Sequence, residues 1–481
     1  MSDVPLAPPT RDVYANRTLN LRSIAAIGYD MDYTLVHYNV GEWEQMAFDA
    51  GKQKLGELGW PTDGIEFDPT TVIRGLVIDV EAGNLLKATR FGYVIRAAHG
   101  SRMLSYNELR DAYAETFVDL GSERFEFMNT LFSLSEASLY AQYIDRLEAG
   151  ELPPGIGHAD VYHLVREAID RAHADGVLKE RILAEPERFI ELDPDLVLTL
   201  RDQRAAGRQL LLITNSEWEY AKEIMAFAFD RFLPEGTTWR DLFSCIIVSA
   251  NKPAFFTGDS PLYKVVDEER ALLRPHLGPI EPGSVFFGGS ARLVERSLGL
   301  SGDQILYVGD HIFGDVHFSK ALLRWRTALI LRELESEIAA LVEFLPRQRE
   351  LERLMADKER LEAEFAALRL AAMRRREGYA APPVAVDDVH AELDRVRAAL
   401  EALDEEIAPL AVEASRLRNS RWGPMMRAGI DKSLFARQVE RYADLYTSRV
   451  SNFLYPGPFA IFRTGRLDLP HDAKLRRRFA D

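Results

Sequence analysis

Two aspartates, Asp30 and Asp32, follow an apolar stretch near the start of the chain and carry its clearest chemical signal. Residues 24–29 (Ile-Ala-Ala-Ile-Gly-Tyr) suit a strand that is buried on both faces. In an extended backbone alternate side chains share a face, so both carboxylates would leave the strand end on one side. Two ionised carboxylates about 4 Å apart repel each other by roughly 4 kcal/mol at an effective dielectric near 20. A divalent cation on one acid and a proton on the other would relieve that repulsion, which leaves one nucleophile and one proton donor.

Two further segments supply an anion site and a cation. Thr214, Asn215 and Ser216 follow the apolar run 209–213. A hydroxyl and backbone N–H groups at a strand-to-helix turn can bind an anion, although Thr-Asn-Ser is also an ordinary helix cap. Lys252 follows another apolar run and, facing the acids, would neutralise both the carboxylates and a transferred phosphoryl group. A lone surface lysine is otherwise simply solvated.

Two more carboxylates lie in the segment 307–315 (Tyr-Val-Gly-Asp-His-Ile-Phe-Gly-Asp). We expect Asp310 to bind a metal ion and Asp315 to orient Lys252 or a metal-bound water. The alternative is a turn with two capping acids.

The formal charges of these groups nearly cancel. Four acids, Asp30, Asp32, Asp310 and Asp315, carry −4. Mg²⁺, which suits oxygen ligands, and Lys252 contribute +3, and a proton on Asp32 brings the site to neutrality. These four acids are the predicted metal ligands, with Asp315 more remote from the ion. Asp30, Asp32, Thr214 and Lys252 are the predicted catalytic residues, acting through an aspartyl-phosphate on Asp30.

The elements that must position these residues alternate between helices and apolar strands. Strands are expected at 209–213, 245–249 and 304–308, with helices at 195–206 and 218–229. This alternation predicts an α/β fold with a doubly wound parallel sheet. Ligands of such sheets bind beyond the carboxyl ends of the strands, where the motif residues fall.

Residues 333–420 have a different character. Apolar residues follow three-four spacing from Leu351 to Ala372 and again from Val389 to Leu410. The pattern predicts a helical hairpin packed along one seam, with an assembly role, and Pro409 is expected to kink or end the second helix. Residues 421–481 are aromatic and apolar, and we expect them to pack on the core or on a neighbouring subunit.

Composition limits the classes of partner. The chain has 481 residues and a formal net charge of −16, which argues against a general binder of nucleic acid or of a membrane surface, because both are anionic. The single cysteine, Cys245, allows no internal disulfide and fits a reducing compartment. No run reaches the ~18 apolar residues of a spanning helix. We expect a soluble, cytoplasmic protein.

The motif order resembles that of the haloacid dehalogenase (HAD) phosphatase superfamily, whose first motif DxDx[TV]L matches residues 30–35. The resemblance implies a HAD-like doubly wound parallel sheet with a mostly helical inserted cap and, in this chain, a helical-hairpin insertion near the C-terminus. The expected domains are an N-terminal arm (1–20), the core in two parts (21–105 and 190–332), the cap (106–189), the hairpin (333–420) and the C-terminal segment (421–481).

Four other segments, with the Asp30 motif, resemble the cytosolic purine 5′-nucleotidases, which prefer IMP and GMP. They are residues 13–19 (Val-Tyr-Ala-Asn-Arg-Thr-Leu), 309–315 (Gly-Asp-His-Ile-Phe-Gly-Asp), 325–327 (Trp-Arg-Thr) and 438–446 (Gln-Val-Glu-Arg-Tyr-Ala-Asp-Leu-Tyr). The resemblance implies a Mg²⁺-dependent 5′-nucleotidase acting on purine nucleoside monophosphates, with phosphate transfer to an acceptor nucleoside as a further activity. It also implies a homo-oligomer, a dimer or tetramer.

The same resemblance assigns a purine site in the cap. Asp170 matches an acceptor for the base N1–H, Arg166 a donor to the six-position oxygen, His173 a stacking surface and Phe132 the opposite aromatic. Lys179 matches a lysine near the phosphate, and Asn215 and Ser216 join the substrate contacts. Buried polar groups left unpaired would reject adenine, which reverses both hydrogen-bonding groups. Without the resemblance, the segment that carries Arg166, Asp170 and His173 would be an amphipathic helix with salt bridges on its surface.

Departures and alternatives remain open. Asp119 and Ala321 stand where vertebrate members carry basic residues of an adenine-nucleotide effector site, so regulation by ATP is doubtful. One alternative is a HAD phosphatase for another small phosphate ester. Another is a non-catalytic nucleotide-binding scaffold that uses the hairpin.

Overall fold

The computed structural model describes residues 7–380, 388–465, 469, 471 and 472, and its core is a ten-stranded sheet. The strand order is β1-β20-β17-β16-β3-β11-β12-β15-β13-β14. Every neighbouring pair from β20 to β15 is parallel, and antiparallel strands lie only at the two edges. The strands are β1 (Tyr14–Ala15), β3 (Ala26–Tyr29), β11 (Gln209–Ile213), β12 (Cys245–Val248), β13 (Leu262–Asp267), β14 (Leu272–His276), β15 (Val285–Gly288), β16 (Ile305–Gly309), β17 (Arg326–Ile330) and β20 (Leu445–Thr447).

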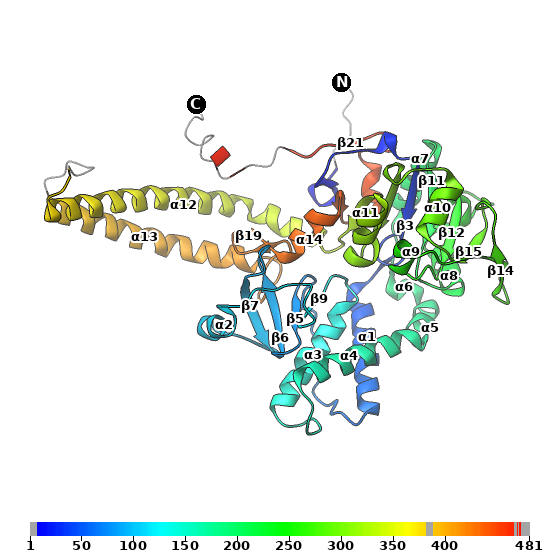
Figure 1. Cartoon of the computed structure of the whole chain (residues 1–481), viewed down its shortest axis with the longest axis horizontal. Coiled ribbons are helices and arrows are strands. Elements are labelled where there is room, and N and C mark those ends of the chain that lie inside the picture. Colours follow the sequence, from blue (N-terminus) through cyan, green and yellow to red (C-terminus); the bar gives the residue numbers. More distant parts are fainter. Residues whose placement is uncertain (1–6, 381–387, 466–468, 470, 473–481) are drawn as a thin grey trace.

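Helices cover this sheet, which confirms the doubly wound parallel fold (Figure 1). They are α7 (Pro194–Ala205), α8 (Trp218–Phe229), α9 (Ala254–Thr257), α10 (Ala291–Leu298), α11 (Phe318–Leu323) and α14 (Leu434–Tyr442). All residues of β3, β12 and β16 are buried. Strands buried on both faces are continuous apolar runs, and this is why the central strands are legible in the sequence.

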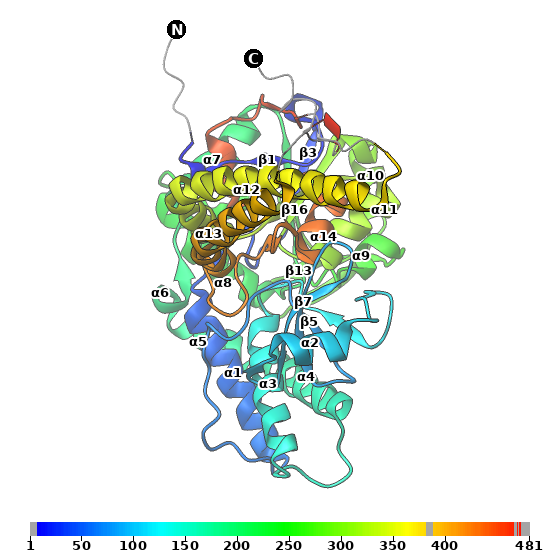
Figure 2. The same cartoon turned by 90° about the vertical axis from the view of Figure 1, so that its left-hand side faces the viewer.

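A second, antiparallel sheet of five strands, in the order β8-β7-β6-β5-β9, belongs to the inserted cap. Its strands are β5 (Val77–Asp79), β6 (Asn84–Ala88), β7 (Val94–His99), β8 (Arg102–Met103) and β9 (Phe125–Phe127). Its helices are α1 (Val40–Glu57), α2 (Tyr106–Tyr113), α3 (Ser133–Glu148), α4 (His158–Ala174), α5 (Val177–Ala184) and α6 (Pro186–Phe189). Figures 1 and 2 both place α1, α3 and α4 at the end of the molecule opposite the chain termini.

The expected boundary between core and cap at 105/106 differs from the structure. β5 pairs with β9, and residues from α1, the sheet, α3 and α4 share one apolar cluster that includes Phe48, Leu85, Tyr140 and Val161. Most of residues 40–103, which we assigned to the core, therefore pack with the cap, although Trp43, Met46 and Ala47 of α1 belong to the apolar cluster of the core. Which sheet a strand joins depends on a pairing between distant segments.

The helical hairpin consists of α12 (Leu334–Glu377) and α13 (Val389–Arg416), which lie side by side and project from the body (Figure 1). Leu354, Leu368 and Val396 are buried between them. Pro409 lies inside α13, which continues to Arg416, so the expectation that it ends the helix is wrong. Residues 381–387, which include part of the connection between the two helices, lie outside the described residues.

The two ends of the chain pair with each other. β1 is antiparallel to β20, and β2 (Leu19–Asn20) is antiparallel to β21 (Ile461–Phe462). Two further pairs of short strands complete the described sheets: β4 (His37–Tyr38) pairs with β10 (Ile190–Glu191), and β18 (Arg427–Ala428) pairs with β19 (Asp431–Lys432). Residues 1–6 of the expected arm, and 466–468, 470 and 473–481 of the C-terminal segment, lie outside the described residues. Among the helices of the described residues, none has the length and apolar character needed to cross a membrane.

Candidate active site

Three carboxylates meet where β3 and β16 end. Asp30 follows β3 and Asp310 follows β16, and these two strands are parallel neighbours with Tyr29 opposite Val308. One carboxylate oxygen from each of Asp30, Asp310 and Asp315 lies within 4.8 Å of the others. We call these three residues the carboxylate cluster. The expected convergence of acids at the strand ends is therefore present for three of the four predicted residues.

Lys252 lies against this cluster. Its ammonium is 2.7 Å from Asp30 Oδ1 and 2.8 Å from Asp315 Oδ1, and it donates to the Tyr307 hydroxyl at 3.0 Å. Burial by itself lowers the pKa of Lys252, but the adjacent carboxylates of Asp30 and Asp315 raise it well above its usual range. The lysine is therefore a fixed positive charge. Of the two roles predicted for Asp315, orienting Lys252 or orienting a metal-bound water, the structure contains the contact that the first requires.

Asn215 holds the backbone of Lys252 in place. The Asn215 amide accepts from the Lys252 N–H at 2.6 Å and donates to the Lys252 carbonyl at 3.1 Å. This reciprocal pair joins the turn after β11 to the turn after β12. In the structure Asn215, which we predicted as a substrate contact, positions the lysine.

Burial makes the cluster costly to ionise. It raises the pKa of Asp30 to about 7, against the lowering effect of Lys252. It also raises the pKa of Asp310 well above its usual range, although Arg74 lowers it. The Asp310 Oδ2 atom is buried and has no hydrogen-bond partner among the described residues. Three buried carboxylates, one unpartnered oxygen and a single lysine make a set of oxygen donors that fits Mg²⁺.

Asp32 lies apart from the carboxylate cluster. Its Oδ1 accepts from the Tyr38 hydroxyl, and its Oδ2 accepts from the Ser216 hydroxyl at 2.7 Å. The Tyr38 hydroxyl also lies 2.9 Å from that of Tyr220. Hydroxyl groups can donate or accept, so this environment can hold Asp32 in either protonation state. The fourth predicted metal ligand has instead the surroundings of a proton carrier.

The remaining predicted residues near the strand ends have separate contacts. Thr214 is buried, and its hydroxyl accepts from the Ser216 N–H at 3.0 Å. Lys179 lies on α5, where it pairs with Glu217 at 3.0 Å and lies 5.4 Å from the ring centroid of Tyr220. Lys179 is therefore linked to the surroundings of Asp32 through an aromatic ring.

The four predicted purine contacts line one cavity of about 350 Å³, which we call the cap pocket. Phe132, Arg166, Asp170 and His173 come from the cap, and His311, next to Asp310, comes from the core. The pocket thus adjoins the carboxylate cluster through His311.

The two predicted stacking rings do not form parallel plates. Phe132 and His173 have centroids 6.1 Å apart and an interplanar angle of 88°. Edge-to-face packing is a favourable arrangement for aromatic rings, and His173 lies instead roughly parallel to Trp43, at 29°. A planar base can stack on one of these rings but not between them as they stand, which corrects the expected sandwich.

Arg166 is anchored by the pocket itself. Its guanidinium donates to the Tyr162 hydroxyl at 2.6 Å and lies 3.5 Å from Glu126. Burial raises the pKa of the nearby Glu136 to about 7, although Arg166 lowers it. The pocket therefore holds a donor whose orientation is set before any ligand binds.

Sequence reasoning missed several residues that complete the site. Tyr307 accepts from Lys252 and donates to the Ile213 carbonyl at 3.0 Å. Tyr38 holds Asp32, and Arg74 donates to the Asp310 backbone carbonyl. The sequence did offer a signal for Tyr307. It is a polar side chain in an apolar strand, and it stands two residues before Gly309 and three before Asp310. Tyr38 comes from the short strand β4 and Arg74 from a turn before β5, and neither stands in a recognisable motif.

Comparisons with known proteins match almost the whole chain. A family model described as "5' nucleotidase family" matches residues 13–474. A 5'-nucleotidase domain-containing protein of Dictyostelium discoideum is 28% identical over 492 residues, covering 99% of this chain and 77% of that protein. The human 5'-nucleotidase domain-containing protein 2 is 28% identical over 486 residues, covering 96% of this chain and 85% of that protein. A solved archaeal beta-phosphoglucomutase from Pyrococcus aligns with a TM-score of 0.30 and 10% identity, over 64% of this chain and 87% of that chain.

Proposed function

Because the chain belongs to the 5′-nucleotidase family, we propose that it is a Mg²⁺-dependent hydrolase of purine nucleoside 5′-monophosphates that prefers IMP and GMP. The coarser assignment, a phosphatase for phosphate monoesters, follows from the family match. The observation that carries the proposal is the approach of Asp30, Asp310, Asp315 and Lys252 within hydrogen-bonding or metal-binding range.

The first step is attack by Asp30 on the phosphorus. The bond between phosphorus and the nucleoside 5′-oxygen breaks, and Asp32 gives its proton to that oxygen. The products are the nucleoside and an aspartyl-phosphate on Asp30. Lys252, 2.7 Å from Asp30, stabilises the negative charge of the phosphoryl group during transfer.

The second step releases phosphate. Water attacks the phosphorus of the aspartyl-phosphate while Asp32, now a carboxylate, takes its proton. Asp30 is restored as a carboxylate and Asp32 as an acid. The hydroxyls of Tyr38 and Ser216 can follow both states of Asp32, because each can donate or accept. A nucleoside in place of water gives phosphotransfer through the same intermediate.

The metal ion would be held by Asp30, Asp310 and Asp315. When bound, Mg²⁺ would offset the charge of the phosphate and of the buried acids. This requirement explains why the unpartnered Asp310 oxygen is kept in a buried site.

Base selection belongs to the cap pocket. Asp170 supplies an acceptor and Arg166 a fixed donor, which suit the N1–H and six-oxo groups of hypoxanthine and guanine. Adenine has an acceptor and a donor at those positions, so both groups would be left unpaired. His173 or Phe132, but not both, offers a face to the base.

Phosphate release from IMP, GMP, AMP, UMP and a sugar phosphate, with and without Mg²⁺, tests the proposal. Asp30→Asn should lower turnover of IMP by roughly 10³-fold or more, because the nucleophile is lost. Asp49→Asn, an exposed acid on α1, is the matched control. Near wild-type turnover by Asp30→Asn would refute the nucleophile.

Asp170→Ala separates the chemistry from the choice of base. It should bring the IMP-to-AMP ratio of kcat/KM close to one while hydrolysis of a small aryl phosphate is unchanged. An unchanged ratio would leave the phosphatase standing but would remove the purine assignment. A sugar phosphate preferred over every nucleotide would support a different small ester as substrate. We also propose that the enzyme is cytoplasmic and that it forms a homo-oligomer. Light scattering of the full chain tests the oligomeric state.

A further inference from the structure

Two histidines and a glutamate face one another in the cap, outside the phosphatase site. His99 is the last residue of β7, Glu148 the last of α3 and His158 the first of α4. Glu148 Oε1 lies 2.9 Å from His158 Nε2 and 3.4 Å from His99 Nε2. Three element ends from separate parts of the cap thus bring their polar atoms to one point.

The other ring nitrogens fix the orientation of both imidazoles. His158 Nδ1 lies 2.9 Å from the Glu81 carbonyl, which can only accept, so this nitrogen carries the proton. His99 Nδ1 lies 2.8 Å from Asn84 Oδ1, and the Asn84 amide donates to the Tyr113 hydroxyl. The neutral form of each ring therefore presents an unprotonated Nε2 to Glu148.

Three acceptors that face one another need a cation between them. A proton on one imidazole is one solution, and a metal ion that binds all three acceptors is the other. His158 stands at the N-terminus of α4, where the partial charge is positive, and Glu148 stands at the C-terminus of α3, where it is negative. The helix ends do not separate the two solutions, because each places a cation on His158 beside an ionised Glu148, and the binding experiment below distinguishes them.

We propose that His99, Glu148 and His158 bind a divalent transition-metal ion of the Zn²⁺ class. Ligands about 2.0–2.1 Å from a tetrahedral ion lie roughly 3.3 Å apart, and the distances of 2.9 Å and 3.4 Å from Glu148 Oε1 to the two Nε2 atoms bracket that value. Imidazole nitrogens with hydrogen-bonded Nδ1 atoms are the usual ligands of such ions, and the hydrogen bonds are part of the site.

The backbone around the site is closely fitted. Gly83 has φ +71°, and a Cβ there would lie 3.1 Å from atoms of both rings. The side chains of His99 and His158 are 27% and 26% exposed, so solvent can complete the coordination. The ion would join the end of β7 to α3 and α4. This role is independent of phosphate chemistry.

The test is metal binding by the full chain after treatment with a chelator, in excess Mg²⁺ so that the carboxylate cluster is occupied. Wild type should bind one Zn²⁺, gain Tm on doing so, and give the visible absorption of tetrahedral Co²⁺ with Co²⁺. His158→Gln and Glu148→Gln should each weaken Zn²⁺ binding by roughly 100-fold or more. His163→Gln, an exposed histidine on the same helix, should behave as wild type.

Folding is checked separately by circular dichroism, and Glu148→Gln keeps the size of the side chain. The proposal is overturned if Zn²⁺ binding and its gain in Tm are the same in His158→Gln, Glu148→Gln and His163→Gln. It is also overturned if wild type binds no Zn²⁺ and its cap is stabilised only by lowering the pH.

Discussion

Lys252 is the residue on which the active site depends electrostatically. It is buried, and its ammonium contacts Asp30, Asp315 and the Tyr307 hydroxyl. Burial raises the pKa of Asp30 to about 7 even though Lys252 lowers it, so without this cation the carboxylate would be more fully protonated near neutral pH. The position of this one ammonium therefore decides whether Asp30 can act as a nucleophile.

Tyr307→Phe removes one of the three contacts of Lys252 without changing the shape of the ring. A hydrogen bond to a charged group contributes about 1.5–3 kcal/mol, so we expect kcat/KM to fall by roughly tenfold or more. Tyr93→Phe, at a side chain that is 63% exposed, is the control and should change nothing. Activity of Tyr307→Phe within twofold of wild type would show that the carboxylates alone hold Lys252.

The sequence was informative about residues that directly follow a buried strand and silent about the side chains that come from other positions to support them. Asp30, Asp310 and Lys252 could be found because each follows a buried apolar strand. The rotation of Asp32 toward Tyr38 could not, because it follows from the path of the chain after residue 32. The perpendicular rings of Phe132 and His173 likewise follow from packing on Trp43.

At the scale of elements, three of the segments that carry the family resemblance meet at Asp444. This buried carboxylate accepts from Arg326 at 2.9 Å and from the Thr327 N–H at 3.1 Å, and it lies 3.7 Å from Arg17. Lys320 also donates to it. We infer that the segments 13–19, 325–327 and 438–446 resemble the family because their contacts hold β1, β17 and β20 together.

Asp444→Asn should destabilise the protein while sparing the active-site geometry. It leaves several cations without their buried anion, and breaking such a pair costs about 3–5 kcal/mol. Unfolding in urea, followed by tryptophan fluorescence, measures the change. Asp431→Asn, whose partner Arg90 is 40% exposed, should cost less than about 1 kcal/mol. Equal losses in the two variants would contradict this role.

The outer half of the hairpin should be dispensable for catalysis. The ion pairs Lys358–Asp404 and Arg395–Glu364 show the antiparallel register of the two helices, in which the numbers of two facing residues add up to about 760. The base of the hairpin reaches the body, where Glu337 accepts from the backbone N–H groups of Met425 and Met426.

Replacing residues 362–398 by a short Gly-Asn loop should leave kcat/KM within about twofold of wild type, because the removed contacts are internal to the hairpin. Light scattering on the same variant reports whether assembly uses the removed part. Loss of activity in a folded protein of unchanged oligomeric state would show that the outer hairpin supports the site.

The boundary error in the cap has a cause at this scale. Residues 77–103 contain four short strands, β5 to β8, and nothing in their own sequence says which sheet they join. What assigns them to the cap is β9, twenty residues further on, which pairs with β5. A local pattern specifies a strand, whereas membership of a sheet depends on contacts between segments far apart in the chain.

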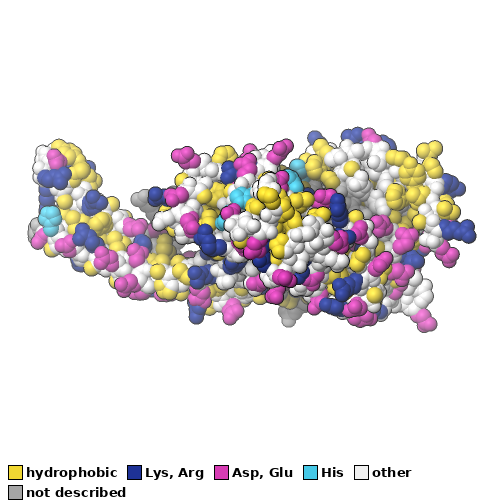
Figure 3. Space-filling view, turned by 90° about the horizontal axis from the view of Figure 1, so that it is seen from below, with side chains coloured by type: hydrophobic (Ala, Val, Ile, Leu, Met, Phe, Trp, Pro, Cys, Tyr) yellow, Lys and Arg dark blue, Asp and Glu magenta, His cyan; other side chains and the backbone are white. Residues whose placement is uncertain are grey.

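At the scale of the whole molecule, the proposed chemistry and the proposed recognition of the base lie in different units. The carboxylate cluster is on the core, and the cap pocket is on the cap except for His311. Acidic and basic side chains are interspersed over the face drawn in Figure 3, although the net charge is −16. A phosphate ester therefore depends on local cations such as Lys252 rather than on the general field of the protein.

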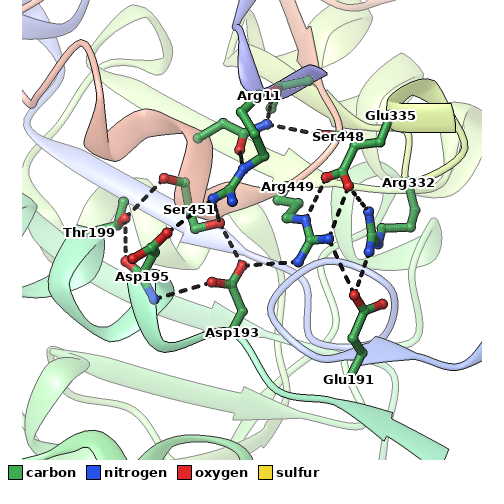
Figure 4. A network of polar contacts seen from close by, with 12 residues as sticks. Arg11, Glu191, Asp193, Asp195, Thr199, Arg332, Glu335, Ser448, Arg449 and Ser451 are labelled. Carbon is green, nitrogen blue, oxygen red and sulfur yellow. Dashed lines mark hydrogen bonds and ion pairs between the residues drawn. The ribbon is translucent and has the colours of Figure 1, made fainter. Parts of the chain in front are cut away.

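A network of ion pairs joins the chain ends to the core and to the base of the hairpin (Figure 4). Arg449 lies 3.0 Å from Glu335 on α12, 3.2 Å from Glu191 on β10 and 3.8 Å from Asp193. Ser451 donates to Asp193 and accepts from Arg11, which brings in the N-terminal segment. Segments from four parts of the sequence thus depend on one guanidinium.

Arg449→Met should lower Tm by a few degrees at pH 7, because it removes the cation shared by these carboxylates. Burial raises the pKa of Glu335, but the hydrogen bond and charge of Arg449, with Arg332, lower it to about 2. Since its unfolded pKa is near 4.5, the pair stabilises above that pH, and the stabilisation is lost as the pH falls toward 2. The gap in Tm between wild type and Arg449→Met should therefore narrow as the pH falls below about 4.5.

Arg353→Met, on the exposed side of α12, should show little difference from wild type. A gap that is constant between pH 7 and pH 3 would mean that Arg449 acts by packing and not by charge.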